Sequence, residues 1–131
     1  LAGLTAAGLE HSDDLVVHGD FSQDSGESAM RVLLSRRPDL DAVFCANDLM
    51  AAGALRVLRE AGLDVPRAVS VVGFDDAPLA QSTHPPLTTV HQSPEQMGRE
   101  MVALLLDTMR HPDEPPEPRL LETRLVVRDS S

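Results

Sequence analysis

Three short apolar runs alternate with amphipathic segments along the first half of the chain. Each run is continuous rather than alternating, which is typical of parallel strands covered by helices on both faces. Between the runs, apolar positions at helical spacing predict helices from about Glu27 to Arg37 and from Asn47 to Gly62. The order β-α-β-α-β predicts an α/β fold, a doubly wound parallel sheet with flanking helices in three layers, α/β/α. The runs are Leu15–His18, Asp41–Ala46 and Val69–Phe74, and residues 1–10 before them resemble the end of a helix.

The second half of the chain follows a different pattern. Residues 77–93 hold three prolines and a short β-prone LTTV, and we interpret them as a connector. Ser93 and Gln96 form a capping box around a proline at the first helical position, which predicts a helix over residues 94–110. The prolines and acids of residues 111–118 predict a stiff acidic linker. The alternation of apolar and polar residues over Arg119–Arg128 predicts an edge strand. The predicted apolar face of the helix comprises Met97, Met101, Leu104, Leu105 and Thr108.

Polar residues follow the second and third apolar runs at the point where each run ends. Asn47 and Asp48 follow one of them, and Asp75 and Asp76 follow the other. In doubly wound sheets the ligand binds outside the carboxyl ends of the strands, so these residues should converge on one crevice. Asn47 and Asp75 come first after their strands, and an amide beside a carboxylate suits a polyol or a nucleobase. For Asp48 and Asp76, capping of a helix or a turn is the competing interpretation.

Phe21 lies three residues beyond the first apolar run, in a loop rich in Ser, Asp and Gly. Its ring could pack against the helix of residues 27–37. Alternatively, it could form an aromatic platform on which a sugar or a base ring stacks. Position alone leaves both interpretations open.

Composition excludes several classes of function. The chain has 131 residues, enough for one domain, and a net charge of −10, which argues against nonspecific binding to nucleic acid. All 11 basic residues are Arg. Without Lys there is no Walker-type phosphate loop and no Schiff-base chemistry, and a magnesium site of Asp48, Asp75 and Asp76 for phosphoryl transfer is disfavoured.

Neither a GxSxG nor a GxGxxG motif occurs, and no His pair has zinc-ligand spacing. We therefore expect a binding protein rather than an enzyme, with no metal and no cofactor. No apolar run is long enough to span a membrane, which predicts a soluble protein. The single cysteine, Cys45, lies in a strand-like run and suits a reducing cytoplasm.

Four motifs together carry a specific resemblance. CANDLMAAGALRVLREAG, VSVVGFDD and PPLTTVHQ, followed by the capped helix, resemble the C-terminal part of a LacI/GalR-family bacterial transcriptional regulator. The resemblance implies an incomplete periplasmic-binding-protein-like fold of type I. It also implies a cytoplasmic, ligand-sensing protein that binds a small-molecule effector, foremost a sugar, in a cleft between two subdomains. Operator DNA would be bound only through an N-terminal helix-turn-helix outside these residues.

The resemblance also implies roles for individual residues. In the family the aromatic residue of the GDF segment stacks on the effector, which points to Phe21. The Asn of the AND motif and the first Asp of GFDD bond the effector, which points to Asn47 and Asp75. Gln92 follows LTTVH at the crossover between the subdomains, near the cleft. Family dimers use the helix after AND, which implies interface positions, although a crowded contact within the chain is an equal alternative; these positions are Leu49, Met50, Ala52 and Gly53.

The family also implies a division of the chain. Residues 1–92 correspond to the C-terminal effector-binding subdomain without its first strand, and residues 112–131 to a linker and a returning edge strand. Residues 93–111 form a helix that in the family packs on the N-terminal subdomain. Without that partner its apolar face would be exposed, so we expect a homodimer, formed by exchange of this helix across residues 77–93.

A periplasmic sugar-binding protein of a transporter is the main alternative, because it shares the fold and a similar cleft. The PPLTT and GFDD motifs favour the regulator. A metal-dependent phosphotransfer enzyme is the third hypothesis, and the absence of Lys disfavours it.

Overall fold

The structure, a computed structural model, describes residues 2–9 and 12–131. Leu1 and Glu10, at the ends of the first predicted helix, lie outside the described residues. The α-helices are α1 (Ala2–Ala6), α2 (Gln23–Arg36), α3 (Asp48–Glu60) and α4 (Pro94–Arg110), and the 3₁₀ helices are η1 (Asp13–Leu15) and η2 (Pro78–Gln81). The strands are β1 (Ala42–Phe44), β2 (Ser70–Asp75), β3 (Thr88–His91) and β4 (Arg124–Val126).

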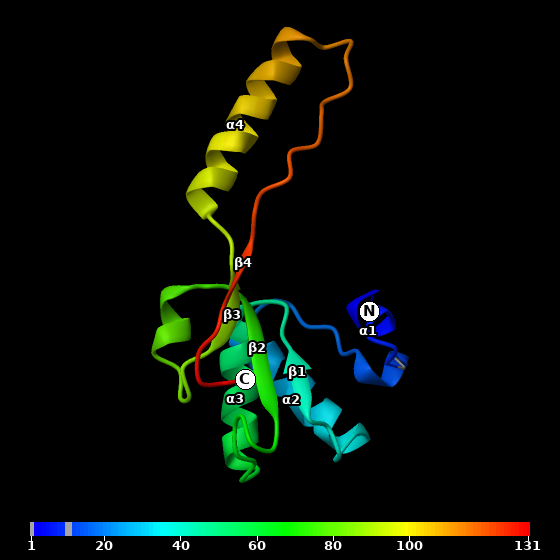
Figure 1. Cartoon of the computed structure of the whole chain (residues 1–131), viewed down its shortest axis with the longest axis vertical. Helices are drawn as coiled ribbons and strands as arrows, with labels where there is room; N and C mark the ends of the chain where they lie inside the picture. The colour runs from blue at the N-terminus through cyan, green and yellow to red at the C-terminus, as the bar shows by residue number, and fades with distance from the viewer. Residues whose placement is uncertain (1, 10–11) are drawn as a thin grey trace.

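The four strands form one sheet in the order β1-β2-β3-β4. β1, β2 and β3 are parallel, with Val43 opposite Val71 and Gly73 opposite Thr89. β4 returns antiparallel to β3 at the edge of the sheet. These pairings confirm the predicted α/β class with a mainly parallel sheet and flanking helices. They also direct the carboxyl ends of β1, β2 and β3 to the same side, toward α4 (Figure 1).

The core lies between the sheet and the helical layer of α2 and α3. Met30, Leu58 and Val71 are at most 1% exposed. Gly26 and Gly53 allow the two helices to approach closely, because a Cβ on Gly53 would lie 2.2 Å from the Gln23 carbonyl oxygen. The remaining apolar core residues come from α3, from η2 and from positions in or next to the strands: Cys45, Met50, Ala51, Ala54, Leu55, Val57, Val69, Ala80 and Leu87.

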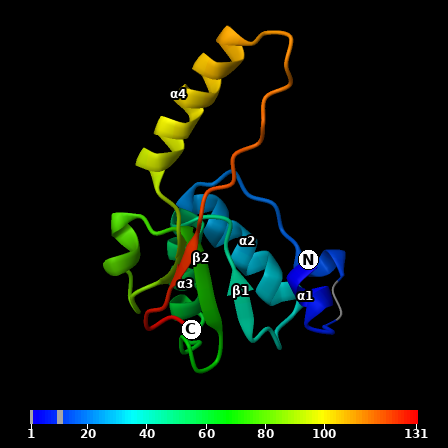
Figure 2. The same cartoon turned by 45° about the horizontal axis from the view of Figure 1, so that its top comes forward.

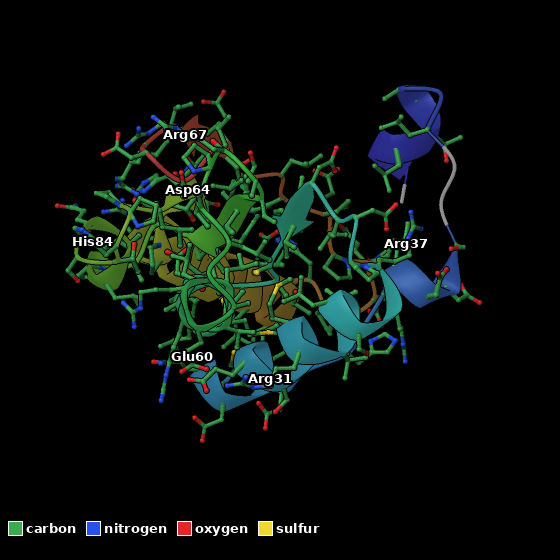
Figure 3. The ribbon with its side chains drawn as sticks, turned by 90° about the horizontal axis from the view of Figure 1, so that it is seen from below. Arg31, Arg37, Glu60, Asp64, Arg67 and His84 are labelled. Carbon is green, nitrogen blue, oxygen red and sulfur yellow. The ribbon has the colours of Figure 1, made fainter. Side chains whose placement is uncertain are left out.

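Ion pairs reinforce the contact between α2 and α3 on its outer side. Arg31 Nη2 lies 2.7 Å from Glu60 Oε2, and Figure 3 shows the two side chains converging from their helices. Arg56 Nη1 lies 3.0 Å from Glu27 Oε1. The opposite face of the sheet is open at β1, where Phe44 is 65% exposed. The third layer is therefore incomplete, in line with the expected incomplete fold.

The predicted strand at Leu15–His18 is wrong. Leu15 ends the 3₁₀ helix η1, and the following residues take no regular structure. An apolar groove of about 300 Å³ lies between these residues and β1. Its lining includes Val16, Val17, Val43 and Phe44. A strand exists only through hydrogen bonds to a neighbour about 4.7–4.9 Å away, and in the described part of the chain the partner of β1 is β2, not this segment.

Other predicted boundaries shift. α2 begins at Gln23 rather than near Glu27, because the Ser22 hydroxyl caps it by accepting from Ser25 N. The TTV of the β-prone LTTV, together with His91, forms β3, an internal strand within the predicted connector. The returning strand is shorter than Arg119–Arg128, since only Arg124–Val126 pair with β3.

α4 has the predicted bounds and the predicted cap, with Ser93 Oγ accepting from Gln96 N. None of its residues is buried. In Figures 1 and 2, α4 projects away from the sheet and the chain after it runs back toward β4. None of the described helices is both long and apolar enough to cross a membrane.

Candidate functional site

The candidate site lies where the three parallel strands end. Asn47 follows β1, Asp75 is the last residue of β2, and Gln92 follows β3. Because these strands are parallel, the three side chains begin at one edge of the sheet. Phe21 reaches the same edge through a hydrogen bond, in which Asn47 Nδ2 donates to the Phe21 carbonyl oxygen at 2.9 Å. The structure thus joins Phe21 to Asn47 and places them at the same end of the sheet as Asp75 and Gln92.

Phe21 stands in a turn that exposes its ring. Its φ of 67° is in the left-handed region, which is rare for a bulky residue. Asp20 Oδ1 accepts from Ser22 N at 3.0 Å and from Ser22 Oγ at 2.5 Å, and these bonds fix the turn around Phe21. The same bonds, with one to Ser25, lower the pKa of Asp20 to about 2. Phe21 is 62% exposed, so packing against α2 does not account for its ring.

Asn47 links that turn to α3. Its Oδ1 accepts from Met50 N at 2.9 Å and caps the helix, while its Nδ2 donates to Phe21 O. An amide carries two N–H donors and two acceptor lone pairs. One donor and one lone pair of Asn47 therefore remain for a ligand. The helix cap is therefore Asn47 and not Asp48, for which capping was the competing interpretation from sequence.

Asp75 and Gln92 form the second part of the site. Gln92 Nε2 donates to Asp75 Oδ1 at 2.6 Å, and both residues are half-buried. Asp75 has a φ of 111°, a left-handed value that a non-glycine residue seldom adopts. A carboxylate and an amide so placed can bond adjacent hydroxyl or N–H groups of a ring.

Asp48 has a role that the sequence did not reveal. It is 1% exposed, and its carboxylate accepts from Ala77 N at 2.7 Å and from Thr89 Oγ1 at 2.6 Å. A Cβ on residue 73 would lie 2.3 Å from Asp48 Oδ1, which explains the glycine there. Asp48 therefore ties α3 to β3 and to the loop after β2 beneath the site.

Asp76 makes a further contact that was not anticipated. Its Oδ1 lies 2.6 Å from Arg128 Nη2 and its Oδ2 lies 3.0 Å from His91 Nδ1. Burial alone would raise the pKa of Asp76, but the bonds from Arg128 and His91 outweigh it and hold that pKa below its ordinary value. The carboxylates of Asp48, Asp75 and Asp76 thus bond different groups. No local signal could have paired Asp76 with a residue so distant in sequence.

The predicted dimer positions divide into two groups. Met50 is 7% exposed and Gly53 is buried against α2, so both take part in the contact within the chain that the sequence left as the alternative. Leu49 is 44% exposed and Ala52 is half-buried. Only these last two are accessible for a contact between subunits.

Comparison with known proteins adds the family. A model of a periplasmic binding protein-like domain matches residues 2–131. The chain belongs to this family. The chain is 53% identical, over 127 residues, to the HTH-type transcriptional regulator CelR of Thermobifida fusca. That match covers 97% of this chain and 37% of the relative.

Solved structures agree. The transcriptional regulator CelR–cellobiose complex has a TM-score of 0.93 and 52% identity, covering 99% of this chain and 40% of that one. A sugar-binding LacI-family regulator from Escherichia coli, complexed with phosphate, has a TM-score of 0.84 and 32% identity, covering 99% and 46%. The chain thus spans less than half the length of each relative. The resemblance to LacI-type regulators is confirmed, and relatives that regulate transcription favour that interpretation over a transport protein or an enzyme.

Proposed function

We propose that this chain is the effector-binding portion of a LacI-type transcriptional regulator and that its effector is a sugar. The observation that carries the proposal is the convergence of Phe21, Asn47, Asp75 and Gln92 at one sheet edge. An exposed aromatic ring beside amide and carboxylate groups suits a ring that bears several hydroxyls. The relative solved with cellobiose, which is 52% identical, supports the same ligand class.

Each residue has a defined part in this proposal. The Phe21 ring stacks on one face of the sugar. Asp75 accepts hydrogen bonds from hydroxyls, and Gln92 and the remaining N–H of Asn47 donate to them. The effector is held between this edge and a second subdomain elsewhere in the full-length protein. The full-length protein has two conformations, and the effector binds one of them more tightly. Its binding therefore shifts the equilibrium toward that conformation.

The remaining parts of the proposal concern the assembly. The segment of residues 93–111, which contains α4, packs on that second subdomain, and residues 112–131 return to the sheet. Leu49 and Ala52 lie at a homodimer contact. Operator DNA is bound by a helix-turn-helix outside these residues, in the cytoplasm, and no residue of this chain is assigned a catalytic role.

Thermal unfolding of the full-length protein tests the effector site. The panel comprises cellobiose, ribose and the nucleobases. A ligand at 100 times its dissociation constant stabilises the folded state by about 2.7 kcal/mol, which raises Tm by several degrees. We expect cellobiose to give this shift, and Phe21→Ala or Asp75→Asn to abolish it.

Asp64→Ala is the matched control. Asp64 is an exposed acid that precedes β2, and Figure 3 shows it beside Arg67, its partner at 3.8 Å. This variant should keep the full shift. A shift with a nucleobase instead of a sugar would change the ligand class. A shift that survives both Phe21→Ala and Asp75→Asn would place the effector elsewhere.

A further inference from the structure

The end of β2 carries two consecutive residues in left-handed backbone conformation. Asp75 has a φ of 111° and Asp76 a φ of 56°, and neither is glycine. Such conformations persist only where the surroundings hold them, and they gather at functional sites. Here the first of the two is the proposed effector ligand Asp75. What holds the turn therefore determines where the Asp75 carboxylate lies.

The main chain of the turn is held from below. Ala77 N donates to the buried Asp48 carboxylate at 2.7 Å, and Asp76 N donates to Thr89 Oγ1 at 3.4 Å. Thr89 Oγ1 in turn donates to Asp48 at 2.6 Å, so the acid and the hydroxyl act as one anchor. This anchor is rigid because Asp48 and Thr89 are both at most 1% exposed.

The side chain of Asp76 links the end of β3 to the residues that follow β4, the two strands between which α4 lies in sequence. His91 ends β3, just before the chain leaves for α4, and Arg128 follows β4, where the chain has returned. The Asp76 carboxylate bonds both of them, and the Asp76 and Arg128 side chains are only 13% and 16% exposed. Arg128 Nη1 also donates to the Leu87 carbonyl oxygen at 2.8 Å, which fixes the guanidinium. We call Asp76, His91 and Arg128 the crossover clamp.

The crossover clamp adjoins the effector site at two points. Asp76 follows Asp75 and His91 precedes Gln92, and Asp75 and Gln92 are themselves joined at 2.6 Å. In Figure 1, the segment leaving β3 and the segment entering β4 are the two chains that join α4 to the sheet. A ligand that moves Asp75 or Gln92 therefore acts next to the start of the first segment, at His91, and reaches the second segment through Arg128 and β4.

We propose that Asp76, acting through Arg128 and His91, is a positioning residue that couples the effector site to the posture of α4. This inference rests on the proposed function and specifies how its site is linked to the rest of the protein. The carboxylate holds Asp75 in its strained orientation. It also fixes the end of β3, where the outgoing connection begins, and the residues after β4 relative to the strand that carries Asp75. Asp76 itself touches no effector.

Asp76→Asn in the full-length protein tests the coupling. Asn tolerates a positive φ and has nearly the same size, so the variant removes mainly the charge. With cellobiose as the probe in titration calorimetry, we expect the dissociation constant to rise at least fivefold. Arg128→Gln should give a similar rise, and the double variant should be no worse than either single one, because both break one interaction. Arg128→Lys, which keeps the charge, should retain part of the affinity.

Arg31→Gln is the control, because it breaks an exposed ion pair of similar length, 2.7 Å, away from the site (Figure 3). It should leave the dissociation constant unchanged. An unchanged value in both Asp76→Asn and Arg128→Gln, or losses that add in the double variant, would overturn the coupling.

Amide hydrogen exchange without ligand provides an independent readout. In Asp76→Asn and Arg128→Gln we expect faster exchange in residues 74–78 and also in residues 91–97, at the start of α4. Faster exchange in residues 74–78 alone would overturn the link to α4 and leave a merely local role. If the unmodified protein binds no member of the sugar panel, the proposed effector class fails, whereas the exchange experiment still decides whether the crossover clamp holds α4.

Discussion

Asn47 shows how one side chain can serve both the fold and the candidate site. Its carbonyl oxygen caps α3 through Met50 N, and its amide nitrogen holds the Phe21 main chain at 2.9 Å. The cap stabilises the helix, whereas the second bond sets where the exposed ring stands. These two roles can be separated, because different atoms of Asn47 perform them.

Asn47→Asp and Asn47→Ser should therefore separate stability from binding. Both residues are good helix caps, so Tm should change little, whereas Asn47→Ala should lose about 1 kcal/mol of unfolding free energy. An ionised Asp has no donor for the Phe21 carbonyl, and the Ser hydroxyl stands on a shorter side chain than the amide, so both variants should weaken cellobiose binding. Chemical denaturation and calorimetry measure the two quantities. Wild-type affinity in both variants would show that the Phe21 turn does not depend on Asn47.

Cys45 is expected to be unreactive in the folded state. It is 7% exposed, and burial, aided by the charge of Asp48, raises its pKa to about 12. At pH 8 the native thiol should resist Ellman's reagent, and unfolding in guanidinium should expose one reactive group. Because the folded pKa lies above the unfolded one, this residue favours the folded state at neutral pH, and that contribution declines between pH 9 and about 12. Rapid labelling of the native protein at pH 8 would contradict this assignment.

At the scale of elements, the contact between α2 and α3 depends on glycines. A Cβ on Gly53 would lie 2.2 Å from Gln23 O and 2.8 Å from Glu27 N, both backbone atoms that cannot move aside. Replacing a helical glycine by alanine normally stabilises a helix by roughly 0.5–1 kcal/mol. At Gly53 the clash should reverse that sign.

Gly53→Ala should destabilise the chain by about 1–3 kcal/mol, the usual cost of overpacking a core. Gly98→Ala is the matched control, because a Cβ there meets nothing within 4 Å. That variant should be neutral or stabilising. Urea denaturation of both proteins gives the comparison, and equal stability of the two would show that α2 and α3 can separate without cost.

Local signals predicted some elements well and others poorly. The bounds of α4 follow from its capping box and terminal residues, which are neighbours in sequence. The start of α2 was misplaced because Ser22 is one of several Ser and Asp residues that could cap it. The strand at Leu15–His18 was wrong because strand formation requires a partner, which an apolar run does not reveal. β3 was underestimated because its Thr88 and Thr89 hydroxyls look exposed in sequence but are bonded in the interior.

The candidate site could also be predicted only in part from the sequence. Asn47 and Asp75 follow apolar strands, so the general location of ligands in doubly wound sheets already indicated them. The crossover clamp was not predictable, since Asp76 and Arg128 meet only through the return of β4 to the sheet. The sequence also did not reveal the buried role of Asp48, because a buried acid that accepts from Thr89 has the same local pattern as a helix cap.

At the scale of the whole molecule, α4 is the long helix that the rest of the chain leaves uncovered, because none of its residues is buried. Met101, Leu105 and Met109 lie on one face at helical spacing and are 67%, 60% and 70% exposed. Contiguous apolar surface of this kind marks a contact with another protein surface. In the full-length protein we assign that contact to the second subdomain. In the described part of this chain nothing covers the face, since α4 has no buried residue.

The isolated chain of 131 residues should therefore self-associate through α4. Size-exclusion chromatography with light scattering should show a dimer or larger species. Leu105→Glu should shift it toward the monomer, because a charge cannot be buried in an apolar contact without a partner. Ala103→Glu adds the same charge on the opposite side of the helix, about 200° away from Leu105, and should leave the association unchanged. A monomer whose α4 amides are still protected from hydrogen exchange would contradict the prediction, since α4 would then be stable without covering its apolar face.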